Sequence, residues 1–218
     1  YHTRGTGGEC NFDGGSAWIE SSSSAMDAEF ACVGDIFQGD HDCSGDNDDE
    51  QPASSIAASM EAPMADGPNQ GFRRGDALLV AVAITDEDEQ PTGNATSPQD
   101  VYSRLLSVVG DPRRMVFLGI AGGSNCQGAY GEADNAQRMQ NLVDRFDAND
   151  RGIFWDLCEG RLEDGLEEAF RVIEAACNEL PPPCSADIDD DCWPADVPPG
   201  GDPQYCINNP DDPGCQLD

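Results

Sequence analysis

Residues 77–89 read Ala-Leu-Leu-Val-Ala-Val-Ala-Ile-Thr-Asp-Glu-Asp-Glu and decide the fold class. Eight apolar residues, 77–84, are followed at once by Thr85 and four acidic residues. A continuous apolar run that ends abruptly in polar residues is typical of a strand buried on both faces of a parallel sheet. This run is also the longest apolar stretch of the chain. A membrane-spanning helix needs about 20 such residues, so we expect no membrane insertion.

Apolar runs and helical periodicity alternate along the chain after this strand. Further strands are predicted at 114–121 and 152–157, and helices at 132–146, at 161–177 and from Ser97 onward, with Ser97 as N-cap and Pro98 in the first turn. The last helix is expected to turn five residues inward: Leu162, Leu166, Phe170, Ile173 and Ala176. Alternating strands and helices with short loops predict right-handed crossovers onto a sheet. The expected architecture is α/β, with an open, mainly parallel sheet and helices on both faces.

Composition divides the chain into three parts. Residues 1–25 are rich in Gly and Ser and predict an irregular N-terminal segment, whereas 26–180 form the α/β domain, which opens with short helices at 25–37 and 52–64. Residues 181–218 contain Pro, Asp and four cysteines with few apolar residues, so we expect an irregular, disulfide-stapled tail. Ten cysteines suit five disulfides in an oxidising compartment. We therefore expect an extracellular or cell-surface location for what we interpret as a processed piece of an exported protein.

The charge of the chain excludes some classes of partner. There are 43 acidic residues against 11 basic ones, all of them Arg, which gives a net charge of −32. Nucleic-acid binding requires Lys and Arg to neutralise phosphates, and docking on anionic membranes requires a basic patch. We therefore expect no nucleic-acid partner, and we expect instead a protein partner or self-association.

The strand that ends in Thr85-Asp86 carries a resemblance to a known family. Residues 78–88, together with Cys32, Cys43 and the triplet Glu50-Gln51-Pro52, resemble von Willebrand factor A domains of the secreted bacterial type. The resemblance covers about residues 26–178 and makes 77–85 the fourth strand of a sheet with the order 3-2-1-4-5-6. The family's Asp-x-Ser-x-Ser motif is missing from the chain. If the resemblance holds, the first strands lie upstream of Tyr1.

The resemblance implies a divalent cation, Ca²⁺ or Mg²⁺, at the top of the sheet. Asp86 matches the family's ligand after the fourth strand, Glu50 falls near the ligand from the middle loop, and Asp88 is a further candidate. From the residues alone, a role of Asp86 in a turn or a helix start is as plausible as a role as a metal ligand. The resemblance also implies a disulfide between Cys126 and Cys158, and the next pair that we expect is Cys32–Cys43.

A second candidate cation site lies in the acidic loop 40–51. The residues at positions 1, 3, 5, 7 and 9 of a calcium-binding loop have oxygen ligands, and Gly45 stands at position 6. Position 12 is Gln51 instead of Glu, so a solvated acidic loop is the alternative interpretation. The five candidate ligands are Asp40, Asp42, Ser44, Asp46 and Asp48.

Without its first strand, the sheet would leave residues 77–85 as an apolar edge. Such an edge is a template for pairing with another chain, so we expect it to be covered by the missing N-terminal strands as a separate chain or by a strand of a neighbouring subunit. The chain has two histidines, His2 and His41, and neither has a positioned nucleophile nearby. The leading hypothesis is thus a secreted adhesion or protein-interaction module that depends on a divalent cation. The alternatives are a structural subunit of an extracellular filament, stabilised by disulfides and calcium, and an extracellular hydrolase.

Overall fold

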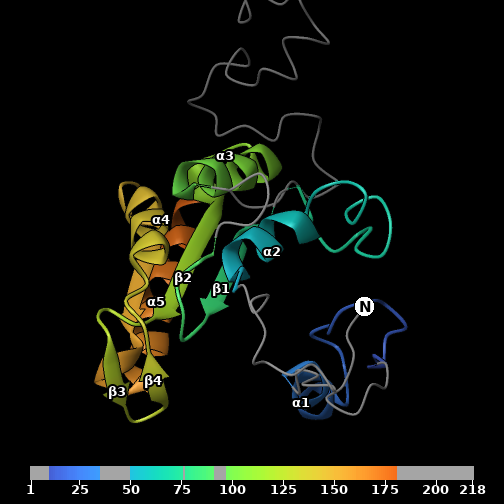
Figure 1. Ribbon diagram of the computed structural model, residues 1–218. Coiled ribbons are helices and arrows are strands. Elements are labelled where there is room, and N and C mark those ends of the chain that lie inside the picture. Colours follow the sequence, from blue (N-terminus) through green and yellow to red (C-terminus); the bar gives the residue numbers. More distant parts are fainter. Residues whose placement is uncertain (1–9, 35–49, 76, 91–96, 181–218) are drawn as a thin grey trace, which may run out of the picture. The chain divides into compact units, whose positions relative to one another are not determined.

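The structure, a computed structural model, describes residues 10–34, 50–75, 77–90 and 97–180 (Figure 1). The contacts of the chain group it into two units, Tyr1–Cys177 and Asn178–Asp218. Nearly all of the second unit, and with it the predicted tail, lies outside the described residues. The acidic loop with its five candidate ligands, 40–48, and Cys43 also lie outside them.

The described part of the first unit is built on a parallel sheet of three strands. These are β1 (Leu79–Ile84), β2 (Met115–Ala121) and β5 (Gly152–Asp156), in the order β1-β2-β5. Both pairings are parallel, and the register sets Val82 beside Leu118 and Phe117 beside Gly152. The predicted strands and the parallel α/β class are therefore confirmed.

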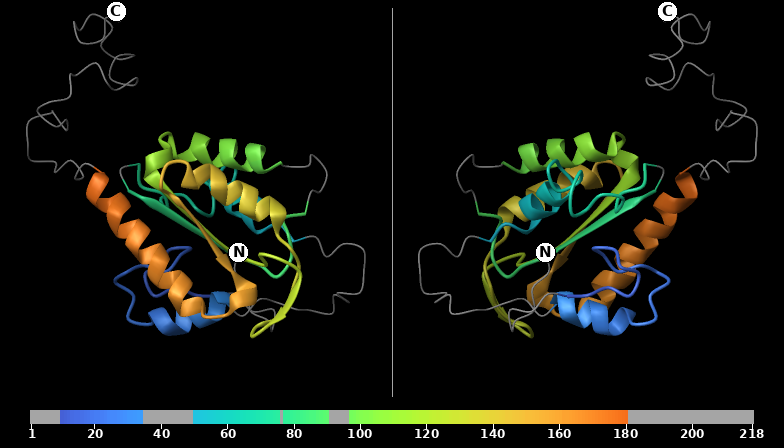
Figure 2. Two further views of the ribbon diagram at one scale, coloured as in Figure 1. Left: turned by 90° about the vertical axis from the view of Figure 1, so that its left-hand side faces the viewer. Right: turned by 90° about the vertical axis from the view of Figure 1, so that its right-hand side faces the viewer.

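Helices cover both faces of this sheet (Figure 2). On one face, α2 (Pro52–Ser59), α3 (Pro98–Val109) and α4 (Gln137–Asp147) enclose a core that includes Phe117, which stacks on Phe146 with ring centroids 5.3 Å apart. On the other face, α5 (Leu162–Glu179) packs on a second core. The buried residues of this second core are Val116, Leu118, Ile120, Ile153, Ala169 and Ala176.

Local sequence explains where α3 begins. The Ser97 hydroxyl accepts a hydrogen bond from the Asp100 amide, and the Asp100 carboxylate accepts one from the Ser97 amide. This reciprocal capping box satisfies two amides that a helix start would otherwise leave without a partner. Pro98 occupies the first turn, where its missing N–H costs nothing. The predicted start at Ser97-Pro98 is therefore confirmed.

Other predicted element boundaries are wrong. The helix expected at 132–146 starts only at Gln137, because an antiparallel hairpin of β3 (Cys126–Gly128) and β4 (Gly131–Ala133) precedes it. Gly131 lies in this hairpin with φ +118°, a conformation that favours glycine. The helix expected at 52–64 is also shorter than predicted, because α2 ends at Ser59. Of the helix expected at 25–37, α1 covers Met26–Gly34, and residues 35–37 lie outside the described part of the chain.

The expectation that α5 turns both Leu166 and Phe170 inward is wrong as well. Phe170 is 68 % exposed and Leu166 is 39 % exposed. The orientation of α5 explains their exposure. Glu168 and Val172, on the other side of the helix from Leu166 and Phe170, line a hollow together with Ile153 of β5. That side of α5 therefore faces β5, so Leu166 and Phe170 lie on the β1 side, where no described element covers them.

Candidate functional site

The carboxyl ends of the three parallel strands place their following loops at one rim of the sheet, as expected for a ligand site in an open α/β fold. These loops are residues 85–90 after β1, 122–125 after β2 and 156–159 after β5. The rim therefore contains two of the predicted cation ligands, Asp86 and Asp88. The third, Glu50, lies beside them, because its carbonyl oxygen accepts a 2.7 Å hydrogen bond from the Gln90 amide.

Asp88 is engaged by a helix. Its Oδ1 accepts hydrogen bonds from the amides of Arg138 (3.0 Å) and Met139 (3.1 Å) in the first turn of α4. The N-cap of that helix, Ala136, has no capping side chain. A carboxylate at this place satisfies the open amides and complements the positive end of the helix dipole. Asp88 therefore holds α4 against the rim.

Glu89 does the same for α2 and was missed by sequence reasoning. Its side chain is buried, and its two oxygens accept hydrogen bonds from the amides of Ala53 (2.9 Å) and Ser54 (2.8 Å). Gln51, the N-cap of α2, supplies no capping side chain. The acidic run after β1 thus joins two helix N-termini to the end of one strand.

Asp86 is an exposed acid of this rim. Its carbonyl oxygen accepts a 2.7 Å hydrogen bond from the Asp134 amide, while its carboxylate makes no hydrogen bond to any residue that the structure describes. Within that described part, no group of three His, Cys, Asp or Glu residues is placed to hold a metal ion. Of the predicted rim ligands, Asp88 is committed to α4. Cation binding at Asp86 and Glu50 stays a prediction.

The predicted disulfide Cys126–Cys158 is present, with its Cα atoms 5.9 Å apart. It ties the β3–β4 hairpin to the turn after β5, where Oδ1 of Asp156 accepts hydrogen bonds from the amides of Gly123 (2.8 Å) and Cys158 (2.9 Å). This end of the rim is therefore covalently fixed.

The predicted pair Cys32–Cys43 is wrong. Cys32 of α1 is bonded to Cys10, which lies 22 residues earlier. The chain reverses between them, because the Asp13 carboxylate accepts hydrogen bonds from the hydroxyl (2.7 Å) and amide (3.2 Å) of Ser24, and Glu29 of α1 accepts one from the Asp13 amide. The two bonds from Ser24 lower the pKa of Asp13, with the Ser24 hydroxyl as the main cause. Reversal of the N-terminal segment brings Cys10 to α1.

A second candidate site lies along β1 itself. No strand in the described part of the chain pairs with its outer side. The Thr85 amide donates to the Ile120 carbonyl oxygen of β2, so the odd-numbered residues of β1 direct their main-chain groups toward β2. Because these directions alternate along a strand, Val80, Val82 and Ile84 point their N–H and C=O groups outward.

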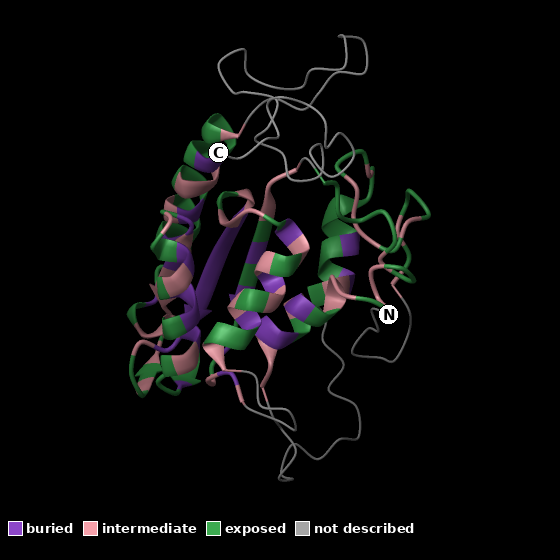
Figure 3. Ribbon diagram, turned by 90° about the horizontal axis from the view of Figure 1, so that it is seen from above, coloured by how far each residue is buried: buried purple, intermediate pink, exposed green. Residues whose placement is uncertain are grey.

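The same three residues expose apolar side chains. Val80 is 38 %, Val82 44 % and Ile84 60 % exposed, although their partners across β2 are buried. Figure 3 shows the described part of the chain coloured by burial. Leu166 and Phe170 of α5, the helix that packs on this face of the sheet, are exposed as well. We call these five residues the open face. A single scattered apolar side chain at a surface is ordinary, but a contiguous group on an unpaired strand marks an interaction site.

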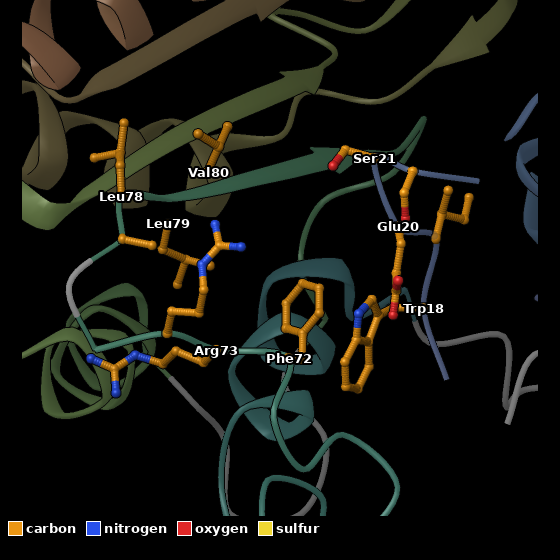
Figure 4. A pocket seen from close by; sticks show the side chains of 12 residues that line it. Trp18, Glu20, Ser21, Phe72, Arg73, Leu78, Leu79 and Val80 are labelled. Atoms are coloured by element: carbon orange, nitrogen blue, oxygen red, sulfur yellow. The ribbon is translucent and has the colours of Figure 1, made fainter. Parts of the chain in front are cut away.

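A groove runs along the amino-terminal half of β1 (Figure 4). It has a volume of about 530 Å³, and its walls come from Leu78–Val80 on one side and residues 18–22 and 72–74 on the others. Trp18 and Phe72 meet edge to face in its wall with ring centroids 5.7 Å apart. The groove adjoins the first two residues of β1, Leu79 and Val80.

Two arginines at the groove are unusual for this protein. Among the arginines that the structure describes, Arg73 and Arg74 are the ones whose side chains make neither a hydrogen bond nor an ion pair. Both side chains are exposed. In a chain with a net charge of −32, neighbouring acids usually engage the available cations. Sequence reasoning missed this pair, although the scarcity of basic residues was a visible signal.

In comparisons with known proteins, no family model, curated protein or solved structure matches this chain. The resemblance to von Willebrand factor A domains therefore stays a prediction. None of the helices in the described residues has the length and apolar character needed to cross a membrane.

Proposed function

We propose that this protein is an extracellular protein-interaction module that binds its partner by adding a strand to the outer side of β1. One observation carries the proposal: β1 has the continuous apolar sequence of an interior strand but lies at the edge of the described sheet. Parallel sheets in α/β proteins are covered on both faces and have apolar interior strands. The open face is therefore the side on which a partner is expected.

The energetics of the edge favour strand addition. A partner strand would satisfy the outward main-chain groups of Val80, Val82 and Ile84 and would also remove apolar surface from water. Full burial of a Val or Ile side chain stabilises by about 1.5–3 kcal/mol. The three side chains are still between 38 % and 60 % exposed, so burial by a partner can recover a fraction of this energy. Main-chain pairing gives affinity, and side-chain contacts give specificity, as in other complexes formed by strand addition.

Two disulfides in the described residues support the extracellular setting. This function does not require a divalent cation, and the Asp88 carboxylate that was expected near the cation holds α4 instead. The distinction from a cation-dependent adhesion site is testable, since strand addition at β1 requires no metal and should continue in the presence of a chelator.

The test uses a neutral peptide of alternating Val and Thr residues as the probe. Its affinity for fluorescently labelled, dilute protein is measured by anisotropy, with and without a chelator. Val82→Lys places a charge in the middle of the open face and should weaken binding by about tenfold or more, which is about 1.4 kcal/mol. Phe30→Lys is the matched control, because Phe30 is also an exposed apolar residue, 68 % exposed, but lies on α1.

We expect the Phe30→Lys variant to bind like the wild type. Peptide binding that is absent, or that the two substitutions weaken equally, would show that β1 does not accept a strand. Hydrogen exchange of the β1 amides gives a second readout, since peptide pairing should slow exchange at Val80, Val82 and Ile84.

A further inference from the structure

We propose that the strand added to β1 is β1 of a second copy of this chain, paired antiparallel across a twofold axis. The inference rests on the proposed function and names the partner. Two observations support it. The open face is apolar, so two copies of it can pack against each other, and the two ends of β1 carry opposite charges. Arg73 and Arg74, whose side chains have no partner among the described residues, precede β1, and the exposed Asp86 follows it.

The charges decide the direction of pairing. In an antiparallel pair, the amino-terminal end of each strand lies beside the carboxyl-terminal end of the other, so Arg73 and Arg74 of one copy approach the Asp86–Glu87 end of its partner. In a parallel pair, arginines would lie beside arginines and acids beside acids. Like charges opposite each other are destabilising, and opposite charges are stabilising. The antiparallel arrangement places the acidic run 86–89 of one copy on the side of the other copy's Arg73 and Arg74.

The geometry of the sheet is consistent with this pairing. The twofold axis that relates antiparallel edge strands is normal to the sheet. The two copies then form one continuous sheet of three strands from each, and their open faces lie next to each other on the same side. Phe170 of each copy extends from α5 on the β1 side and flanks the joined face. Such an interface is isologous and closed, as in most symmetric dimers.

Net charge is the main force against a dimer. Two chains at −32 each repel one another, but at about 0.15 M salt the Debye length is about 8 Å, so distant charges are largely screened. Pairs in contact across the β1 edges are screened less. Association is therefore to be measured at physiological salt and not at low ionic strength.

Sedimentation velocity over a concentration series, up to about 100 µM, tests the inference. We expect a reversible monomer–dimer equilibrium for the wild type and a monomer throughout for Val82→Lys. The double variant Arg73→Glu, Arg74→Glu should weaken the dimer by about tenfold or more. The matched control is Arg113→Glu, Arg114→Glu, which changes the net charge equally at the adjacent arginine pair before β2 and should leave the dimer close to that of the wild type.

Charge reversal provides the rescue. Adding Asp86→Arg and Glu87→Arg to the Arg73→Glu, Arg74→Glu variant should restore the dimer, because each copy then offers basic residues opposite acidic ones. A monomeric wild type over the whole series would overturn the inference. Equal weakening by the two arginine double variants would also overturn it, because a general charge effect would then explain both.

The outcomes separate this inference from the proposed function. If the wild type is monomeric and the neutral peptide still binds in a Val82-dependent manner, the second-copy assignment fails and strand addition stands. If the wild type dimerises and Val82→Lys leaves the dimer intact, the dimer uses another surface and the inference fails. If the peptide does not bind and the wild type is monomeric, both proposals fail.

Discussion

β1 and β2 are both continuous apolar strands but have different surroundings. β2 reads Met-Val-Phe-Leu-Gly-Ile-Ala and is buried at every position, whereas β1 reads Leu-Val-Ala-Val-Ala-Ile and alternates between buried and exposed. β2 lies between two strands and two layers of helices, whereas β1 has a strand on one side and helices on one face. Burial at these positions is therefore set by neighbours and not by the apolar character of the strand, and β1 carries a surface that a partner can use.

The largest expected difference concerns the register partners Leu118 and Val82, which point to the same face. Leu118→Ala should reduce the free energy of unfolding by about 2–5 kcal/mol, because it leaves a cavity between β2 and α5. Val82→Ala should reduce it by less than about 1 kcal/mol, because nothing in the described part of the same chain packs closely over this half-exposed side chain. Urea unfolding at low protein concentration measures both values.

The slope of the unfolding free energy against urea concentration should be the same for both variants and the wild type. Equal slopes would show that neither substitution changes the unfolded state. If Val82→Ala costs as much as Leu118→Ala in dilute solution, β1 is covered within one chain and the comparison between the strands fails. Repeating the measurement at high protein concentration sharpens the comparison, since a second copy on β1 should then increase the cost of Val82→Ala.

The sequence was sufficient for β1 and β2 because each is a continuous apolar run, and for β5 because three large apolar residues, 153–155, form its centre. It was sufficient for the start of α3 because Ser97 and Pro98 act locally. It was insufficient for Phe170, because helical periodicity identifies an apolar side of α5 but not how far the neighbouring elements extend over it. The hairpin before α4 was missed for a related reason. Its strands have three residues each, too few for periodicity to register.

The candidate site was predictable only in part. The sequence located the acidic rim and the exposed edge, but it did not separate the roles of the acids. Glu89 accepts from amides 35 and 36 residues earlier in the chain, and Asp88 accepts from amides 50 and 51 residues later. A run of four acids contains no signal for which of them will meet a helix start. Long-range placement, which only the folded chain shows, assigns these roles.

Glu89 stabilises the face of β1 that α2 covers, because it holds the start of that helix. Ala81 and Ala83 of β1 pack with Ala53 and Ala57 of α2, and Glu89 holds the start of that helix. Glu89→Gln keeps the size but removes the charge and one acceptor, so it should reduce the free energy of unfolding by about 1–3 kcal/mol.

Asp86→Asn is the matched control for Glu89→Gln, because it removes one negative charge from the same loop at an exposed carboxylate. We expect a change within about 0.5 kcal/mol, measured by the same urea titration. Equal losses from the two substitutions would contradict the assignment of Glu89 as the residue that holds α2. A gain in both would instead show that relief of the net negative charge outweighs the helix contact.

The smallest expected effect concerns the ion pair between Glu61, which follows α2, and Arg104 of α3. Glu61, just after α2, receives two 2.8 Å hydrogen bonds from Arg104 of α3. These bonds hold the pKa of Glu61 below its usual value of 4.5. Both side chains are about one-third exposed, so solvent screens the pair and Glu61→Gln should cost only about 0.5–1 kcal/mol near neutral pH.

The pH dependence separates charge from packing at this pair. A carboxyl group whose pKa is lowered by folding stabilises the folded state above the unfolded pKa and loses that contribution as the pH falls through the folded pKa. The difference in unfolding free energy between the wild type and Glu61→Gln should therefore be constant above about pH 5 and should shrink as the pH falls below 4.5. Other acids titrate in the same range, but they do so in both proteins and cancel in the difference. A gap that persists unchanged to pH 3 would mean that Glu61 acts by packing, and the covered side of β1 would then be held by Glu89 and the alanine contacts without help from charge.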